Sequence, residues 1–283
     1  MASEDAIKAG EIHRQVRKYV YGLVKPPCDA FQITQCIQGE IKRLTKDYPN
    51  AGIAFPVGFS INDCAAHWTP SPTDNRTLLS SDIVKVDYGV HINGCIIDSA
   101  FTLYWGDEPP VVAASREALD AAIKMACPDT LLSDIGENVE EIITSYDVKP
   151  VKTLNGHQIL PYRIHGPKII PNISFPQYRE RMSEGEYFAI EPFASTGAGI
   201  TVERGETTHY MVAPEYVNSK ISSSLKQYMG MPFSSTWGLP KKFQRLVKQK
   251  IVQAYPPLYD VGGGIVAQFE HTVYIGKTAY VLS

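Results

Sequence analysis

The sequence of 283 residues has no long hydrophobic run, no signal-like start and no excess of positive charge. A membrane-spanning helix needs about 20 consecutive, mostly apolar residues, and no segment approaches that length. The opening stretch MASEDAIKAGEIHRQVRKYV lacks the apolar core of a secretory signal. A formal net charge of −3 provides no general attraction to nucleic acid. We therefore expect a monomeric, cytoplasmic protein without membrane contact or sequence-specific binding of nucleic acid.

Cysteine is scarce and scattered along the chain. The five cysteines are odd in number and include no CxxC pair. Disulfide frameworks and thiolate zinc sites both need paired cysteines. We therefore expect free thiols in a reducing compartment, and zinc held by cysteine is not expected.

The sequence does contain alternating helix and strand patterns, without a long linker or a low-complexity tract. Apolar residues at helical spacing predict helices that begin after the N-caps Ser3, Asp29 and Ser133, and a further helix over about 113–126. Short apolar segments between turns predict strands, and TPSPTDNRT at 69–77 is typical of an exposed loop.

The segment VKVDYGVHINGCIID at 84–98 predicts a β-hairpin with Asn93-Gly94 in its turn. In that register Asp87 and Asp98 are diagonal neighbours on one face, with Cα atoms roughly 7–8 Å apart. The residues opposite them are small, Ala100 and Gly89, and leave room above this face. Two like charges so close disfavour joint ionisation. The carboxylates either face solvent or are neutralised by cations, and two divalent cations about 3.5–4 Å apart suit such a pair.

Further side chains of the ligand type stand in apolar strands or beside turns. His157 follows the turn in NGH, Glu191 ends the strand in AIEP, and Glu270 lies in AQFEH. SEGEYFAIE (183–191) also repeats the pattern of SSDIVKVD (80–87), in which an acid in a turn is followed by a second acid at the strand end. A duplicated half-domain would relate these acids by a pseudo-twofold axis. Oxygen-rich sites with one histidine suit Mn, Fe, Co or Zn.

Six motifs resemble those of type II methionine aminopeptidases, dinuclear metalloproteases of the pita-bread fold. They are AFPVGFSINDCAAHWTP, VDYGVHINGCIID, LNGHQI, YRIHGPK, AIEPFASTGAG and AQFEHT, within a resemblance that extends from about Ala9 to Val281. The resemblance implies an α+β fold, a pseudo-twofold duplicated antiparallel sheet covered by helices. It implies one catalytic domain over 1–283 with a small helical insert near 211–254. Because no long charged N-terminal extension precedes the motifs, we expect the compact, archaeal-like form.

The same resemblance implies a hydrolase that removes the N-terminal methionine from nascent proteins and peptides with a small second residue. Two divalent cations per chain (Co, Mn, Fe or Zn) are implied as cofactors. Asp98 and Glu270 would bridge them, Asp87 would bind one, and His157 and Glu191 would hold the other. A hydroxide between the cations would attack the first peptide bond, and Glu191 would carry a proton toward the leaving amine.

A second layer of residues takes its roles from the same resemblance. His67 would contact the scissile nitrogen or the substrate amine, and His165 the substrate carbonyl. His271 follows Glu270 on a strand and should face away from it. The chain departs from the family pattern at Gly166-Pro167, which restrict the backbone beside His165. The apolar pocket for methionine is assigned to Phe55, Ile164, His209 and Tyr255.

Two other functions stay open. A proline-specific aminopeptidase or dipeptidase of the same fold would share the ligand pattern, but such enzymes carry a separate N-terminal domain ahead of it. A non-catalytic pita-bread protein that binds nucleic acid or protein partners would have lost ligands, and here all are present. The basic run KKFQRLVKQK at 241–250 favours that second function, although a solvated helix face is the plainer interpretation. The run would also suit a contact with the ribosome, since nascent chains are the implied substrate.

Overall fold

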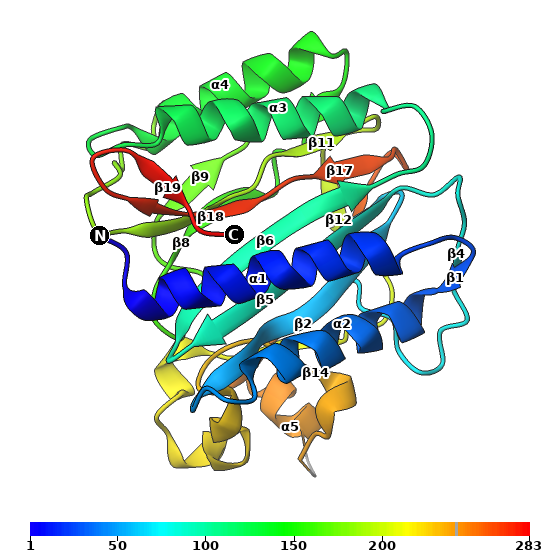
Figure 1. Ribbon diagram of the computed structural model, residues 1–283, viewed down its shortest axis with the longest axis vertical. Helices are drawn as coiled ribbons and strands as arrows, with labels where there is room; N and C mark the ends of the chain where they lie inside the picture. Colours follow the sequence, from blue (N-terminus) through cyan, green and yellow to red (C-terminus); the bar gives the residue numbers. More distant parts are fainter. Residues whose placement is uncertain (241–242) are drawn as a thin grey trace.

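The strands form the middle of the protein, and long helices lie against them (Figure 1). The computed structural model describes residues 1–240 and 243–283. The main strands pair antiparallel, so the predicted α+β class is confirmed. None of the helices in the described part of the chain is long and apolar enough to cross a membrane.

The first half of the chain builds a sheet of order β2-β5-β6 that two helices cover. The Ser3 hydroxyl accepts a hydrogen bond from Ala6 N at 3.2 Å, and the Asp29 carboxylate accepts one from Gln32 N at 2.7 Å. Both predicted N-caps are therefore confirmed. The elements are α1 (Glu4–Leu23), α2 (Ala30–Thr45), β2 (Ala51–Ile61), β5 (Val84–Ile92) and β6 (Cys95–Leu103).

The second half builds a sheet of order β19-β18-β10-β8-β9, against which α3 (Pro110–Met125) and α4 (Leu132–Ser145) pack. The prediction that Ser133 caps α4 is wrong. Leu132 N donates to Glu180 O at 3.0 Å, and this pairing with a distant segment fixes the helix start ahead of the serine. The strands are β8 (Asn155–Ile159), β9 (Ile169–Pro171), β10 (Tyr187–Ile190), β18 (His271–Ile275) and β19 (Ala279–Val281).

Shorter strands complete the layer in two further sheets, β17-β11-β7 and β12-β16-β3, and in the pair β1-β4. Their bounds are β1 (Cys28–Asp29), β3 (Cys64–Ala66), β4 (Thr77–Leu78), β7 (Lys149–Pro150), β11 (Phe193–Ser195), β12 (Thr201–Glu203), β16 (Leu258–Asp260) and β17 (Val266–Gln268). In Figure 1, β6 of the first half runs beside β17 and β18 of the second.

The hairpin of β5 and β6 has the predicted register. Asp87 pairs with Ala100, and Asp98 pairs with Gly89. The Asn-Gly turn therefore fixes the strands as expected, and both carboxylates lie on one face of the sheet.

The predicted internal repeat is also present. The Asp82 carboxylate accepts a hydrogen bond from Leu79 N at 2.9 Å, and the Glu186 carboxylate accepts one from Ser183 N at 2.8 Å. Each acid closes the turn three residues before it, at the entry to β5 or β10. The two halves therefore use the same local interaction to start equivalent strands.

Residues 211–254 begin and end in two strands that pair with each other, β13 (His209–Val212) and β15 (Val252–Tyr255). Between them the chain forms β14 (Phe233–Ser234), the short helix α5 (Phe243–Lys248) and turns of 3-10 helix around buried aromatic rings. The helices that the sequence predicts in this insert are thus mostly 3-10 helices. Lys241 and Lys242, which open the predicted basic run, lie outside the described residues. The 3-10 segments are Pro214–Tyr216, Lys220–Tyr228 and Ser235–Trp237.

Candidate metal centre and active site

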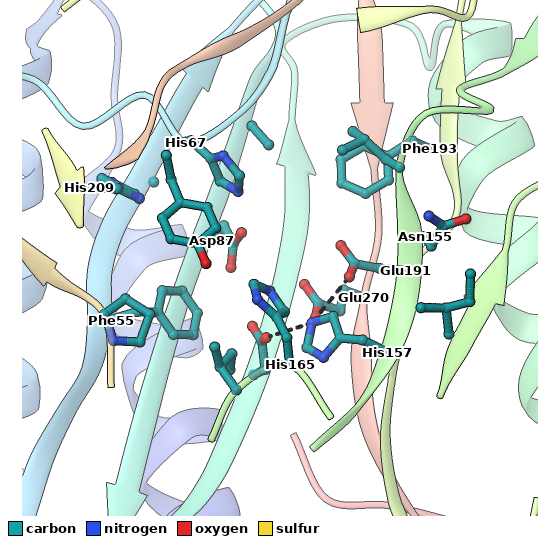
Figure 2. A pocket seen from close by; sticks show the side chains of 18 of the residues that line it. Phe55, His67, Asp87, Asn155, His157, His165, Glu191, Phe193, His209 and Glu270 are labelled. Atoms are coloured by element: carbon teal, nitrogen blue, oxygen red, sulfur yellow. Dashed lines mark ion pairs between the residues drawn. The ribbon is translucent and has the colours of Figure 1, made fainter. Parts of the chain in front are cut away.

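One pocket of about 300 Å³ is lined by residues of both halves (Figure 2). Every side chain that the sequence assigned to the site lines this pocket, although these residues are far apart in the chain. The set comprises Phe55, His67, Asp87, Asp98, His157, Ile164, His165, Glu191, His209, Tyr255 and Glu270.

Five strands or strand ends position the predicted metal ligands. Asp87 lies on β5, Asp98 on β6 and His157 on β8, whereas Glu191 follows β10 and Glu270 stands between β17 and β18. Figure 2 shows Asp87 on one side of the pocket and the Glu191, Glu270 and His157 side chains on the other. The site therefore needs both halves of the fold.

The predicted ligand atoms are close enough to share an ion. Nε2 of His157 lies 3.5 Å from Asp98 Oδ2 and 3.3 Å from Glu191 Oε1. Asp98, His157 and Glu270 each offer one ligand atom, and these three atoms lie within 4.8 Å of one another. Asp98 is 4% exposed and Glu270 1%, so these carboxylates do not form a solvated hairpin face.

The carboxylates are poorly compensated by the protein itself. Oδ1 of Asp87 and Oε1 of Glu270 are buried and have no hydrogen-bond partner among the residues that the structure describes. Burial, together with repulsion from Asp98, raises the pKa values of Asp87, Glu191 and Glu270 well above their usual range. Buried carboxylates without partners are costly unless a cation neutralises them.

These observations fit divalent cations. The donors are oxygen atoms and one imidazole, a combination that suits Mn, Fe, Co or Zn. Aspartate and glutamate oxygens without a hydrogen bond are free to coordinate. The residues present therefore match the predicted cofactor in chemistry, in spacing and in their shortage of protein partners.

Comparison with known families decides the class of protein. The model of metallopeptidase family M24 matches residues 4–277. This chain belongs to metallopeptidase family M24. The predicted divalent cations agree with a family of metallopeptidases and with the buried group of Asp98, His157 and Glu270.

Relatives of this M24 peptidase carry a more specific name. Methionine aminopeptidase 2 of Malassezia globosa is 38% identical over 300 residues, which cover 96% of this chain and 66% of that protein. The chain spans about two thirds of the length of the first curated relatives it matches. The predicted resemblance to methionine aminopeptidases is confirmed, whereas the archaeal-like form stays a prediction.

Solved structures establish the fold. A methionine aminopeptidase from Rickettsia prowazekii superposes with a TM-score of 0.72 at 19% identity, covering 98% of this chain and 94% of that one. A thermophilic Arx1 superposes with a TM-score of 0.83 at 16% identity, covering 100% and 91%. The predicted pita-bread fold is therefore confirmed for this M24 peptidase.

Three histidines border the pocket of the M24 peptidase in neutral form. Burial lowers the pKa of His67 to about 4 and that of His209 to about 3. Burial and the neighbouring His157 imidazole lower the pKa of His165 well below its usual range. The rings of His165 and His157 stand perpendicular, with centroids 4.6 Å apart. At neutral pH these imidazoles therefore act as hydrogen-bonding groups without charge.

Thr69 is a residue of the site that the sequence reading missed. The expectation of an exposed loop from 69 is wrong at its start, because Thr69 is buried. Its hydroxyl donates to Val57 O at 2.6 Å and lies 2.5 Å from His209 Nε2. Since the hydroxyl has one proton and gives it to Val57, it accepts from His209, which fixes the Nε2–H tautomer of that ring. A Ser/Thr/Pro-rich stretch carries no signal that would have revealed this contact.

Gln268 is a second missed residue. Its Nε2 donates to Glu191 Oε2 and to Glu270 Oε2, each at 3.3 Å. The amide therefore links two predicted ligands. Its place two residues before Glu270, on the same side of the strand, was the one available signal.

The room above Gly89 is occupied by an aromatic ring. A Cβ at position 89 would stand 2.3 Å from Phe55 Cε1, so glycine is needed there for the Phe55 ring to reach the pocket. On the far side, Figure 2 shows Phe193 and Asn155 across the ligands from Phe55. Leu154 also lines the pocket and packs in the same hydrophobic cluster as Phe193. The pocket thus has two ends with the predicted ligands between them.

The departure at Gly166-Pro167 leaves His165 in the pocket. Gly166 N donates to Gln158 O at 2.6 Å, and a Cβ at 166 would stand 2.9 Å from that oxygen, so glycine suits this close approach. His271 Nδ1 instead contacts Ser283 Oγ at 2.7 Å, away from the pocket, as predicted.

Proposed function

We propose that this M24 peptidase removes the N-terminal methionine from nascent proteins and peptides that have a small second residue. The observation that carries the proposal is the convergence of five ligand-type side chains and an apolar pocket in one site. Curated relatives named Methionine aminopeptidase 2, 38% identical to the chain, support the same reaction.

We assign the metal ligands as follows. Asp98 and Glu270 would be shared by two cations, Asp87 would hold one of them, and His157 and Glu191 would hold the other. Divalent Co, Mn, Fe or Zn in this site supplies a polarised scissile carbonyl and a water acidic enough to act as nucleophile near neutral pH. The hydrogen bond from Gln268 to the Glu191 and Glu270 carboxylates supports this assignment by fixing the orientation of both groups.

Glu191 is assigned the transfer of a proton to the leaving amine. One carboxylate oxygen faces His157 and the other accepts from Gln268, so the group is held in one orientation. Burial raises the pKa of this carboxyl in the metal-free protein, and a bound cation would keep it ionised and able to accept the proton that it passes on.

His67 and His165 are assigned to the substrate backbone. Both are neutral at pH 7 because burial lowers their pKa values. A neutral imidazole can donate or accept one hydrogen bond without repelling a cation nearby. His67 would hold the scissile nitrogen or the substrate amine, and His165 the carbonyl oxygen.

The methionine side chain is assigned to the end of the pocket with Phe55, Ile164, His209 and Tyr255. This end is apolar and aromatic, which suits a flexible thioether. The second residue would lie toward Leu154, Asn155 and Phe193 at the other end. The Phe193 ring and the Leu154 side chain restrict space there, which favours a small second residue.

The chain is assigned as one catalytic domain over 1–283, with 211–254 as the insert of type II enzymes. His209 pairs with Tyr255 where β13 meets β15, so the base of the insert carries two residues of the methionine pocket. We assign the enzyme to the cytoplasm, as a monomer acting on nascent chains.

A ribosome contact through 241–250 predicts weaker cosedimentation with ribosomes when Lys241, Lys242 and Arg245 are changed to Glu. Unchanged cosedimentation would refute this contact.

The deciding experiment combines metal analysis with peptide cleavage. The purified protein should contain about two divalent cations per chain, release methionine from Met-Ala-Ser, and lose this activity on chelation. Cleavage of Xaa-Pro peptides in place of Met-Ala-Ser would favour the proline-specific alternative. Absence of both activities in the metal-loaded protein would favour the non-catalytic alternative.

A further inference from the structure

The two halves of the fold meet along a seam between β6 and the strands β17 and β18. At the centre of the seam, Glu270 N donates to Ala100 O at 2.9 Å. On either side of this contact a threonine hydroxyl stands between the two backbones. The pairs 98 with 272, 100 with 270 and 102 with 268 keep one antiparallel register across the seam.

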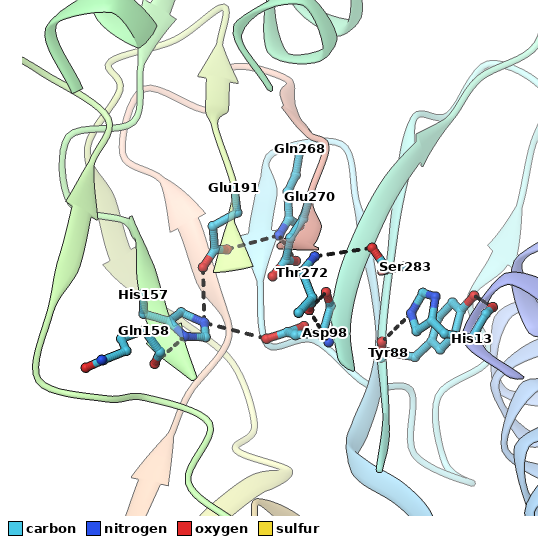
Figure 3. Close-up of polar contacts among 10 residues, drawn as sticks. All are labelled: His13, Tyr88, Asp98, His157, Gln158, Glu191, Gln268, Glu270, Thr272 and Ser283. Atoms are coloured by element: carbon cyan, nitrogen blue, oxygen red, sulfur yellow. Dashed lines mark hydrogen bonds and ion pairs between the residues drawn. The ribbon is translucent and has the colours of Figure 1, made fainter. Parts of the chain in front are cut away.

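The two threonines make mirrored contacts. Thr102 Oγ1 accepts from Gln268 N at 2.9 Å and donates to Gln268 O at 2.7 Å. Thr272 Oγ1 accepts from Asp98 N at 2.8 Å and donates to Asp98 O at 2.6 Å (Figure 3). A threonine of each half thus holds the backbone of a residue in the other half, as the pseudo-twofold symmetry requires.

Each residue held in this way is either a predicted metal ligand or a direct hydrogen-bond partner of two such ligands. Thr272 holds Asp98 itself. Thr102 holds Gln268, whose amide donates to the carboxylates of Glu191 and Glu270. Figure 3 shows Gln268, Glu191, Asp98 and Thr272 in one connected network. On one side of the seam the threonine hydroxyl therefore bonds to the backbone of a predicted ligand, and on the other to a residue whose side chain bonds to two predicted ligands.

The hydroxyls take the place of direct backbone hydrogen bonds to Asp98 and Gln268. In a direct ladder, strands lie about 4.8 Å apart because N–H and C=O groups face each other. Here a side-chain oxygen of the opposite half satisfies both the N–H and the C=O of one residue, whereas at the centre of the seam Glu270 N and Ala100 O bond directly at 2.9 Å. Thr102 is 3% exposed and Thr272 0%, so these contacts are shielded from water.

We propose that Thr102 and Thr272 are positioning residues that set the separation of the two halves at the seam. This separation holds Asp98 and Glu270 at the spacing that binds two cations together. The inference rests on the proposed metal site and adds to it the device that fixes its dimensions. Valine at either position keeps the shape of the side chain but leaves a buried N–H and C=O without partners.

The test compares Thr272→Val and Thr102→Val with Thr272→Ser and Thr102→Ser. Calorimetric titration of the metal-free proteins with Mn²⁺ should show affinity about 10- to 100-fold weaker in the valine variants. The serine variants, which keep the hydroxyl, should bind close to the wild-type affinity. The matched control is Thr45→Val, because the buried Thr45 hydroxyl donates to Ile41 O at 2.8 Å within α2, far from the seam in sequence.

Melting temperature is measured for every variant to separate stability from positioning. Thr45→Val should keep wild-type Mn²⁺ affinity, because among the described residues its hydroxyl contacts only the backbone of its own helix. If Thr272→Val does not fold, Thr272→Ala replaces it, because alanine leaves space for a water molecule where the hydroxyl stood. Weaker Mn²⁺ binding is again expected.

Folded valine or alanine variants that bind Mn²⁺ as tightly as the wild type would overturn the positioning role while leaving the proposed function intact. A wild-type protein that neither binds Mn²⁺ nor releases methionine would overturn both.

Discussion

A carboxylate removed from water keeps its charge only beside a compensating group, and this site gathers four such side chains around one imidazole. The described part of the chain offers them few partners: the Gln268 amide donates to Glu191 and Glu270, and Asp87 Oδ1 has no partner there. At the scale of single residues, these carboxylates therefore suit the binding of a cation and do not stabilise the metal-free fold. The individual side chains can be tested on this basis.

Glu191→Gln should reduce kcat on Met-Ala-Ser by about 10²- to 10⁴-fold, the usual effect of losing a group that transfers protons. The metal-free variant should melt no earlier than the wild type, because the substitution removes a repelled, buried carboxyl. Peptide kinetics and thermal melts measure both effects. A kcat near the wild-type value would contradict the assigned proton transfer.

Thr69→Val should weaken methionine binding, because His209 loses the acceptor that fixes its tautomer. An unpaired buried donor costs about 1–3 kcal/mol, so we expect KM for Met-Ala-Ser to rise about tenfold with a smaller change in kcat. Thr69→Ser should restore the wild-type KM. The exposed Thr77→Val is the matched control, and an equal KM in all three variants would count against the contact.

At the scale of elements, the sequence was informative where a local signal decides the structure. The Asn93-Gly94 turn predicted the full register of the β5–β6 hairpin, because turn type fixes pairing. The start of α4 was predicted wrongly, since pairing of Leu132 with Glu180 overrides the local preference for serine as a cap. The burial of Thr69 and the bridging by Gln268 depend on contacts between distant segments, and no local pattern encodes them.

The β5 strand also offers a test of how close packing shapes the pocket. Gly89→Ala should push the Phe55 ring away and raise KM for methionine peptides, because the added Cβ would stand 2.3 Å from that ring. Gly39→Ala in α2 is the matched control, since a Cβ there would meet no described atom within 4 Å. That variant should gain about 0.5–1 kcal/mol in free energy of unfolding at unchanged KM. Unchanged KM in Gly89→Ala would show that the ring does not form the pocket wall.

At the scale of the whole molecule, the site couples stability to pH. The raised pKa values of Asp87, Glu191 and Glu270 mean that the metal-free folded protein binds more protons than the unfolded chain above about pH 4.5. Its free energy of unfolding should therefore fall as pH rises through the raised pKa values. Cations that hold the carboxylates ionised should remove this loss.

The measurement is the difference in melting temperature between Mn²⁺-loaded and chelated protein. We expect this difference to increase from about pH 5 to about pH 8. The buried neutral histidines lower stability below about pH 6.5 in both forms, so their effect largely cancels in the difference. A metal-induced shift that is constant or shrinks with rising pH would contradict the coupling.

The mirrored turns at Asp82 and Glu186 and the mirrored threonines at the seam have a consequence for the origin of the molecule. A centre built on a symmetry axis draws its groups from both sides, so a chain of half the length would own only part of it. Such an ancestor would have had to associate with a twin to gather the complete set, and fusion of the two genes would have made that association permanent.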